Sequence, residues 1–247
     1  MINPLSSFLD WIYPPACISC HTLLPLNAPQ RFICIHCEPL FEPIAAPFCE
    51  KCGAPIEAEA IGCASCFGKI FHFEHNRSAF LYGDLIRDLL HEMKFRKKKR
   101  VAKGLGELWA THAKLNIPSA DFTFIPMPLH KKKQRERGFN QAEILAAALS
   151  AKFEIPMKNI LHRIHDTPPQ AGLHPTQRAE NVSGIFEICA NHNTNGKNYI
   201  LVDDIFTTGA SLNECAKTLK NSGAAHILCM TFALTVKNIK KTLMKID

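Results

Sequence analysis

The chain of 247 residues lacks an apolar run long enough to cross a membrane. Its most apolar early stretch, Leu5–Tyr13, is short, contains Asp10 and has no positively charged flank, so it does not have the form of a secretory signal. These absences argue against membrane insertion and against a secreted disulfide scaffold, although the chain contains 11 cysteines. We therefore expect a protein of the reducing cytoplasm.

Acidic residues are scarce in the larger, C-terminal part of the chain. Residues 79–247 contain 25 lysines and arginines against 15 aspartates and glutamates, whereas residues 1–78 contain 4 against 7. The net charges of the two parts are therefore +10 and −3. A basic body favours a polyanionic partner, either nucleic acid or a phosphate-rich ligand, although such a surface can also serve solubility alone.

Four Cys-x-x-Cys pairs lie within the first 66 residues. Each pair places two thiolates on one tight turn, and zinc takes four such ligands in a tetrahedron. Two zinc ribbons with structural zinc are therefore predicted, because four thiolates leave no open position for catalysis. Sequence order suggests joining the first pair with the second and the third with the fourth, while a crossed arrangement stays open. The predicted ligands are Cys17, Cys20, Cys34, Cys37, Cys49, Cys52, Cys63 and Cys66.

The sequence pattern changes near residue 78. Residues 1–70 are rich in proline and cysteine without a long periodic segment, which predicts a double zinc-ribbon module that folds with the help of metal. Residues 78–247 are predicted to form a second domain, in which strands and helices alternate. This alternation predicts an α/β fold with a mainly parallel sheet and helices on both faces. Strands are predicted at 79–82, 122–127, 161–164, 185–188, 199–202 and 227–234, helices at 85–93, 105–115, 141–153 and 210–221, and a charged loop at 131–138.

A strand, two acids and a turn of small residues follow one another in Tyr199–Ser211. The strand is predicted to end at Asp203 and Asp204, and a helix to begin near Ala210. Backbone N–H groups and hydroxyls at a helix N-terminus bind phosphate, and Gly209 permits a close approach. The two carboxylates would accept hydrogen bonds from sugar hydroxyls or lie near a magnesium ion. Simple helix capping would explain one of these residues but not the whole run.

This run resembles the phosphoribosyl pyrophosphate (PRPP) motif of type I phosphoribosyltransferases. The resemblance implies that the two acids bind the ribose hydroxyls of PRPP, accompanied by Mg²⁺, and that the turn binds the 5′-phosphate. It also implies that Phe124–Leu129 holds pyrophosphate and that residues 131–138 correspond to a mobile basic loop. The implied PRPP-binding residues are Asp203, Asp204, Thr207, Thr208, Gly209, Ala210 and Ser211, and the implied pyrophosphate loop comprises Met127, Pro128, Leu129, Arg135 and Arg137.

Further segments are similar to the ComF family of competence-associated proteins. They are Pro126–His130, Arg135–Ala142, Asp166–Gly172 and Arg178–Asn181, and they follow the double zinc ribbon in the order that the family has. The resemblance implies a role in natural transformation, in which the protein handles single-stranded DNA after uptake, with a DNA-translocation helicase as a partner. It does not decide whether a phosphoribosyl transfer takes place.

Two basic segments are candidate contacts for single-stranded DNA. Arg87–Lys103 contains eight bases and two acids, and Lys131–Arg137 contains five bases and one acid. A groove lined by both would follow a nucleic-acid backbone and give a salt-dependent affinity, and Phe95 beside it can stack on a base. Arg135 and Arg137 can serve either DNA or pyrophosphate. The candidate DNA-binding residues are Lys94, Arg96, Lys97, Lys98, Lys99, Arg100, Lys131, Lys132 and Lys133.

Two functions are therefore in competition. The favoured one is handling of single-stranded DNA, with a pocket for PRPP or a related sugar phosphate as an additional site. The alternative is an active, magnesium-dependent phosphoribosyltransferase with an unknown acceptor. Both can hold together if PRPP is an effector of DNA handling.

Overall fold

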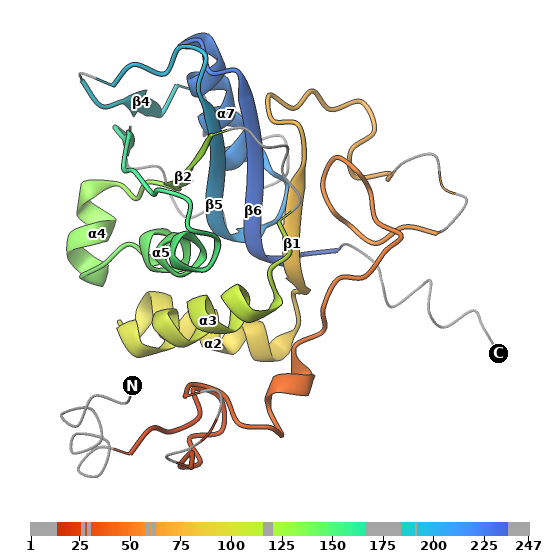
Figure 1. Cartoon of the computed structure of the whole chain (residues 1–247), viewed down its shortest axis with the longest axis vertical. Helices are drawn as coiled ribbons and strands as arrows, with labels where there is room; N and C mark the ends of the chain where they lie inside the picture. The colour runs from red at the N-terminus through yellow and green to blue at the C-terminus, as the bar shows by residue number, and fades with distance from the viewer. Residues whose placement is uncertain are drawn as a thin grey trace.

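The computed structural model describes residues 14–25, 28, 31–57, 60, 63–115, 121–165, 184–190 and 192–236 (Figure 1). The expectations for Leu5–Tyr13, Asp166–Gly172 and Arg178–Asn181 lie outside the described residues. No helix of the described part is both long enough and apolar enough to cross a membrane.

A four-stranded parallel sheet forms the centre of the body, with the strand order β1-β6-β5-β2. The strands are β1 (Asn76–Leu81), β6 (His226–Leu234), β5 (Asn198–Phe206) and β2 (Phe122–Pro126). In the register of the sheet, Ile200 of β5 lies between Phe124 of β2 and Leu228 of β6. The mainly parallel α/β fold predicted from the sequence is therefore confirmed.

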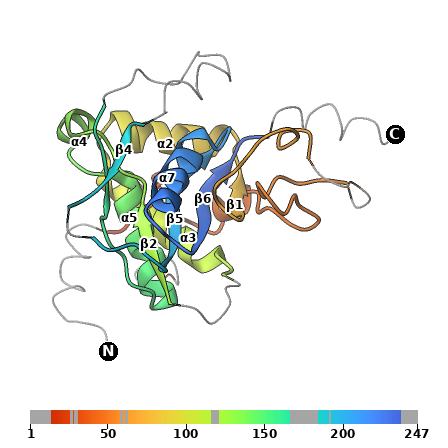
Figure 2. The same cartoon turned by 90° about the horizontal axis from the view of Figure 1, so that it is seen from above.

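Helices cover both faces of this sheet (Figure 2). On one face lie α2 (Asp84–Phe95), α3 (Lys99–His112) and α5 (Gln141–Phe153), and on the other lies α7 (Ala210–Asn221). Alternate residues of β5 divide between these layers: Ile200 packs with the three-helix layer and Leu201 with α7. Because both faces are covered, the central strands are apolar almost throughout.

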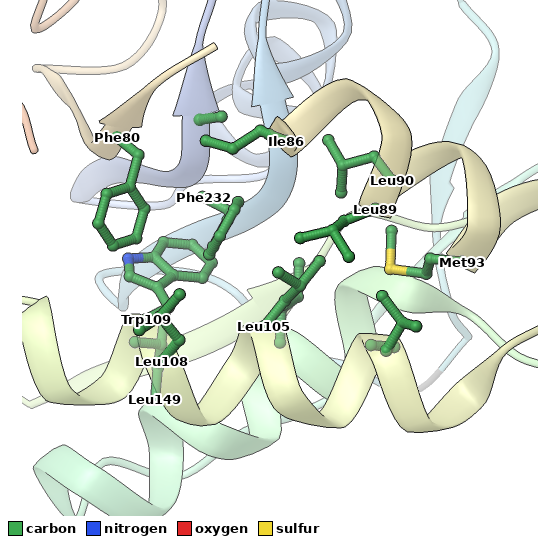
Figure 3. Packing of buried hydrophobic residues seen from close by; sticks show 14 of the residues in the cluster. Phe80, Ile86, Leu89, Leu90, Met93, Leu105, Leu108, Trp109, Leu149 and Phe232 are labelled. Carbon is green, nitrogen blue, oxygen red and sulfur yellow. The ribbon is translucent and has the colours of Figure 1, made fainter. Parts of the chain in front are cut away.

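The core between the sheet and the helices α2 and α3 is built from aromatic and aliphatic side chains (Figure 3). Trp109 of α3 meets Phe232 of β6 edge to face at 6.0 Å between ring centroids, and Phe80 of β1 lies 5.1 Å from the same ring. Leu89 and Met93 extend this core from α2. Since these residues are almost fully buried, they fix α2 and α3 rigidly on the sheet.

The charged segment after β2 is a helix, so the predicted loop at 131–138 was wrong. Residues Lys131–Arg137 form α4. The ring of His130 accepts a hydrogen bond of 3.4 Å from the N–H of Lys132 at its start, and Gly138 ends it with a φ of 83°. Lysine, arginine and glutamine favour helix, but α4 has no buried side chain and therefore no apolar periodicity to reveal it.

Three strands also differ from the prediction, β5 in its length and β3 and β4 in their pairing. β5 does not end at the two acids but continues to Phe206, because its backbone stays paired with β6 up to that residue. The short strands β3 (Leu161–Arg163) and β4 (Phe186–Ile188) pair with each other in antiparallel orientation, as a separate two-stranded sheet.

The cysteine-rich part packs against the body at several points, and it contains a short 3-10 helix, η1 (Glu38–Leu40). Ile18 and Phe32 lie over Gly104 of α3, where a Cβ atom would come within 2.9 Å of the Phe32 Cβ. Between the two groups of cysteines, the N–H of Ile44 donates to the carbonyl of Ala79 on β1 at 3.0 Å. The division into domains at 1–70 and 78–247 stays a prediction.

Candidate functional site

The eight predicted zinc ligands form two groups of four, and within each group the sulfur atoms lie within 4.8 Å of one another. The Sγ atoms of Cys20 and Cys34 are 3.7 Å apart, and those of Cys52 and Cys63 are 3.5 Å apart. Four thiolates at about 2.3 Å from a tetrahedral zinc ion lie roughly 3.8 Å from each other, so both groups fit structural zinc. The pairs join in sequence order, first with second and third with fourth, and not in the crossed arrangement.

In each group of cysteines, at least one buried thiol must lose a proton when the group takes up metal. Burial raises the pKa of Cys37 in the first group and of Cys66 in the second to about 12. Without metal these thiols are protonated at neutral pH, and only the thiolate is a zinc ligand. Metal uptake therefore releases protons and couples zinc binding to pH.

The two acids of β5 lie at the carboxyl edge of the sheet, beside two adjoining cavities of about 210 and 170 Å³. Both cavities are lined by Lys94, Asp203, Asp204 and Ser211. The larger one extends to the loop after β2 and to α4, and the smaller one to residues 207–212. In an open parallel sheet this edge is where ligands bind.

One of the two acids forms an ion pair with a lysine from α2. Lys94, in the last turn of α2, forms an ion pair with the Oδ2 atom of Asp204, whose side chain is only 7% exposed. Burial alone would raise the pKa of Asp204, but the charge of Lys94 and its hydrogen bond, the hydrogen bond with Asp203 and the charge of Arg137 together outweigh it, so the pKa is lowered. Burial and the charge of Asp204 raise the pKa of Asp203 well above its usual range. Asp203 is therefore the carboxyl group of the pair that keeps its proton longer as the pH rises.

A second cation faces the acids from α4. Arg137 lines the larger cavity and donates a hydrogen bond to the Oε1 atom of Gln141. Burial lowers the pKa of Arg137, and the negative charges of Asp204 and Asp203 counteract this. Met127, Pro128 and Leu129 line the same cavity, whereas Arg135 is exposed on α4 and its Nε atom donates to the carbonyl of Lys131 at 3.4 Å.

Residues 207–211 comprise the turn between β5 and α7 and the first two residues of α7. Gly209 adopts a φ of 76° directly before α7, which is a conformation that favours glycine. The N–H of Ala210 donates to the Oγ1 atom of Thr208 at 3.4 Å, and Ser211 lines both cavities. The turn thus presents hydroxyls and the start of a helix of 12 residues to the smaller cavity.

The candidate DNA-binding residues differ in their surroundings. Lys94 and Lys133 line the larger cavity. Lys98 and Arg96 form ion pairs with Glu92 at 2.9 and 3.3 Å. The exposed members are Arg96, Lys97, Lys99, Arg100, Lys131 and Lys132.

Sequence reasoning missed three residues of the larger cavity: Gln141, Arg163 and Phe186. Arg163 lies over the ring of Phe186 at 5.9 Å and comes from the antiparallel pair β3 and β4. For Gln141 the sequence offers a signal, since it lies four residues after Arg137 of the implied pyrophosphate loop. For the other two residues no local pattern indicates that the small sheet reaches the cavity.

Two known family models match separate parts of the chain. Residues 8–72 match the double zinc ribbon domain, and residues 139–247 match the phosphoribosyl transferase domain. Together with the parallel sheet and the two cysteine groups, these matches define a protein with a phosphoribosyltransferase-type fold and an N-terminal double zinc ribbon.

Several relatives are similar to this chain over most of its length. The chain is 29% identical to competence protein ComFC of Bacillus subtilis over 206 residues, which are 81% of this chain and 82% of that protein. It is 29% identical to competence protein F of Haemophilus influenzae, over 85% of this chain and 93% of that one. It is 27% identical to the DNA utilization protein YhgH of Escherichia coli K12, over 74% and 84%. Each of these relatives carries a name that refers to competence or to DNA utilization.

A solved structure of the glutamine PRPP amidotransferase of B. subtilis is also similar, with 17% identity and a TM-score of 0.34. The similarity covers 53% of this chain and a quarter (25%) of the enzyme. A similarity of this size adds nothing to the sheet topology described above.

Proposed function

We propose that this protein acts in natural transformation by handling single-stranded DNA, and that PRPP or a related sugar phosphate binds with Mg²⁺ at the carboxyl edge of the sheet. The observation that carries the proposal is that both basic segments reach the acid-and-turn site at this edge, since Lys94 of the first segment and Lys133 of the second line the cavity that contains Asp203. The names of the relatives, competence protein and DNA utilization protein, support the proposed role in natural transformation. By family resemblance, the proposal places the protein in the cytoplasm with a DNA-translocation helicase as a partner.

The sugar-phosphate part of the proposal assigns a role to each group of the cavity. The N–H groups and hydroxyls of residues 207–211 would hold the 5′-phosphate. Asp203 and Asp204 would accept hydrogen bonds from the ribose hydroxyls, and Arg137 with the backbone of residues 127–129 would hold the pyrophosphate. When bound, Mg²⁺ would neutralise part of the pyrophosphate charge. Lys94 balances the acid pair while no ligand is bound.

The DNA part of the proposal rests on the exposed cations around the same edge. Lys97 and Lys99 lie at the junction of α2 and α3, and Lys131 and Lys132 at the start of α4. Phe95, at the end of α2, is 69% exposed. An exposed ring among cations is the combination that binds single strands, because bases stack on the ring while the cations contact phosphates.

The test is the binding of a fluorescent single-stranded oligonucleotide, measured by anisotropy over a salt titration, with and without PRPP and Mg²⁺. We expect the logarithm of the affinity to fall linearly with the logarithm of the salt concentration. A triple variant with Lys97→Glu, Lys99→Glu and Lys132→Glu should flatten this slope by about 2, because each lost phosphate contact removes about 0.7 for a single strand.

A control variant makes the same change in net charge at another place. Lys152, Lys158 and Lys197 are also exposed, and none of them lines either cavity of the site. Their replacement by glutamate should leave most of the slope in place. Equal losses in the two triple variants would show that only overall charge matters and would remove the proposed DNA surface.

An active phosphoribosyltransferase is the second candidate, and it is favoured by the convergence of the acid pair, the turn and Arg137 on adjoining cavities. In such a reaction a nucleophile forms a bond to C1 of the ribose while the bond from C1 to pyrophosphate breaks. Arg137 would stabilise the leaving pyrophosphate. The test is release of pyrophosphate from PRPP in the presence of candidate bases, with the double variant Asp203→Asn and Asp204→Asn as the inactive reference.

A further inference from the structure

The segment that leaves the second group of cysteines, residues 70–73, lies directly against the proposed phosphate turn. The link is the side chain of Asn213, in the first turn of α7. Its Oδ1 atom accepts a hydrogen bond of 2.6 Å from the N–H of His72, and its Nδ2 atom donates one of 3.0 Å to the carbonyl of Ile70. The N–H of Asn213 also donates to the carbonyl of Gly209 at 2.8 Å. One residue thus connects the turn with the zinc-ribbon segment.

Aromatic rings make a second connection between the same parts. Phe71 and Phe73 lie 4.9 Å apart, and Phe73 meets Phe206 edge to face at 6.4 Å. These rings leave no space at Gly209, where a Cβ atom would come within 2.6 Å of the Phe206 ring and 3.3 Å of the Phe71 ring. The backbone of the turn therefore rests on one ring from β5 and one ring from the zinc-ribbon segment.

Both cysteine pairs of the second group hold this segment. On one side, the N–H of Lys69 donates to the carbonyl of Cys66 at 3.0 Å. On the other side, Lys51 lies between Cys49 and Cys52, and its Nζ atom donates to the carbonyls of Phe73 at 3.2 Å and Glu74 at 2.7 Å. The segment is thus fixed at each end by a turn that the metal would close.

We propose that the second zinc site positions the phosphate turn, and that Asn213 and Phe71 are the positioning residues. When zinc is lost, the two cysteine turns lose the bonds that close them, and residues 70–73 no longer support the turn. A ligand must then order the turn itself, so it binds more weakly. Because such coupling is reciprocal, a phosphate ligand also strengthens zinc binding at this site.

This inference deepens the proposed function, since it rests on the binding of a PRPP-type ligand at the turn. It predicts a difference between the two zinc sites. The first ribbon packs on Gly104 of α3 through Ile18 and Phe32, whereas the second holds residues 70–73. Loss of the second zinc should therefore disturb the turn, and loss of the first should not.

The experiment uses the full chain and measures hydrogen exchange of the amides in residues 207–211, together with the zinc content and the affinity for PRPP with Mg²⁺. Cys66→Ser, which removes a ligand of the second site, should speed up exchange in the turn and weaken PRPP binding by roughly tenfold. Cys20→Ser, which removes a ligand of the first site, should leave exchange in the turn unchanged.

A second variant tests the coupling without touching a zinc ligand. Asn213→Ala should keep two zinc ions per chain, speed up exchange in the turn and weaken PRPP binding, while Asn221→Ala at the other end of α7 should change none of these. Unchanged exchange in both Asn213→Ala and Cys66→Ser would overturn the inference, and so would equal acceleration in Cys66→Ser and Cys20→Ser. If the wild-type chain does not bind PRPP at all, the sugar-phosphate site fails, but the exchange comparison still decides the positioning role.

Discussion

Replacement of Lys94 by methionine should destabilise the fold by about 3 kcal/mol. Methionine keeps most of the length and the packing of the side chain, but it leaves Asp204 buried without its cation. Removing one partner of a buried ion pair costs about 3–5 kcal/mol, and the lower figure applies here because the Lys94 side chain is 22% exposed. Urea unfolding followed by tryptophan fluorescence, to which the buried Trp109 contributes, measures the loss.

The same helix offers a matched control. Arg87 of α2 forms an ion pair with Asp84 at 2.7 Å, but the two side chains are 56% and 88% exposed. Exposed pairs contribute about 0–1 kcal/mol, so Arg87→Met should change the stability much less. The double variant Lys94→Met and Asp204→Asn should recover most of the loss, because no charge is then left unpaired. If Lys94→Met costs no more than Arg87→Met, the ion pair does not balance the acid site as described.

Three further changes have defined outcomes. The raised pKa of Asp203 means that the stability from this group is complete below its unfolded-state pKa and is lost as the pH rises toward the folded-state value. Asp203→Asn should therefore raise the melting temperature at pH 8 more than at pH 5, as measured by calorimetry. Elemental analysis should find two zinc ions per reduced chain and about one in Cys20→Ser; far less than one in the wild type would contradict the zinc assignment. Gly104→Val should destabilise the chain by about 1–3 kcal/mol in urea unfolding, because its Cβ would overlap Phe32 and Ile18; an unchanged midpoint would mean that the first ribbon does not pack there.

The parts of the site that were predicted from the sequence are those encoded by local spacing. Each Cys-x-x-Cys pair is one continuous segment, and so is the run from Asp203 to Ser211. The ligands that such a segment offers can therefore be predicted without knowing the fold. The pairing of the cysteines could not be read, because a Cys-x-x-Cys pair defines one turn and not its partner. Arg163 also could not be assigned, since the position of β3 and β4 beside the cavity depends on contacts far apart in the sequence.

Helical periodicity distinguishes Lys94 from the basic residues that follow it up to Arg100. Lys94 lies four residues after the buried Leu90 and next to the buried Met93. In a helix, residues four apart lie on the same face, so Lys94 had to approach the sheet rather than the solvent. Helical periodicity therefore separates it from the exposed cations that follow it.

The residues between the two zinc sites also protect the sheet against self-association. β1 is an edge strand, and such edges pair readily with other chains when their backbone groups are free. Here the N–H of Ile44 bonds to Ala79, and the N–H of Leu81 bonds to the carbonyl of Glu42 at 2.8 Å. A body produced without residues 1–70 would expose this edge. The double ribbon thus acts as a built-in cover that keeps the sheet from recruiting strands of neighbouring molecules.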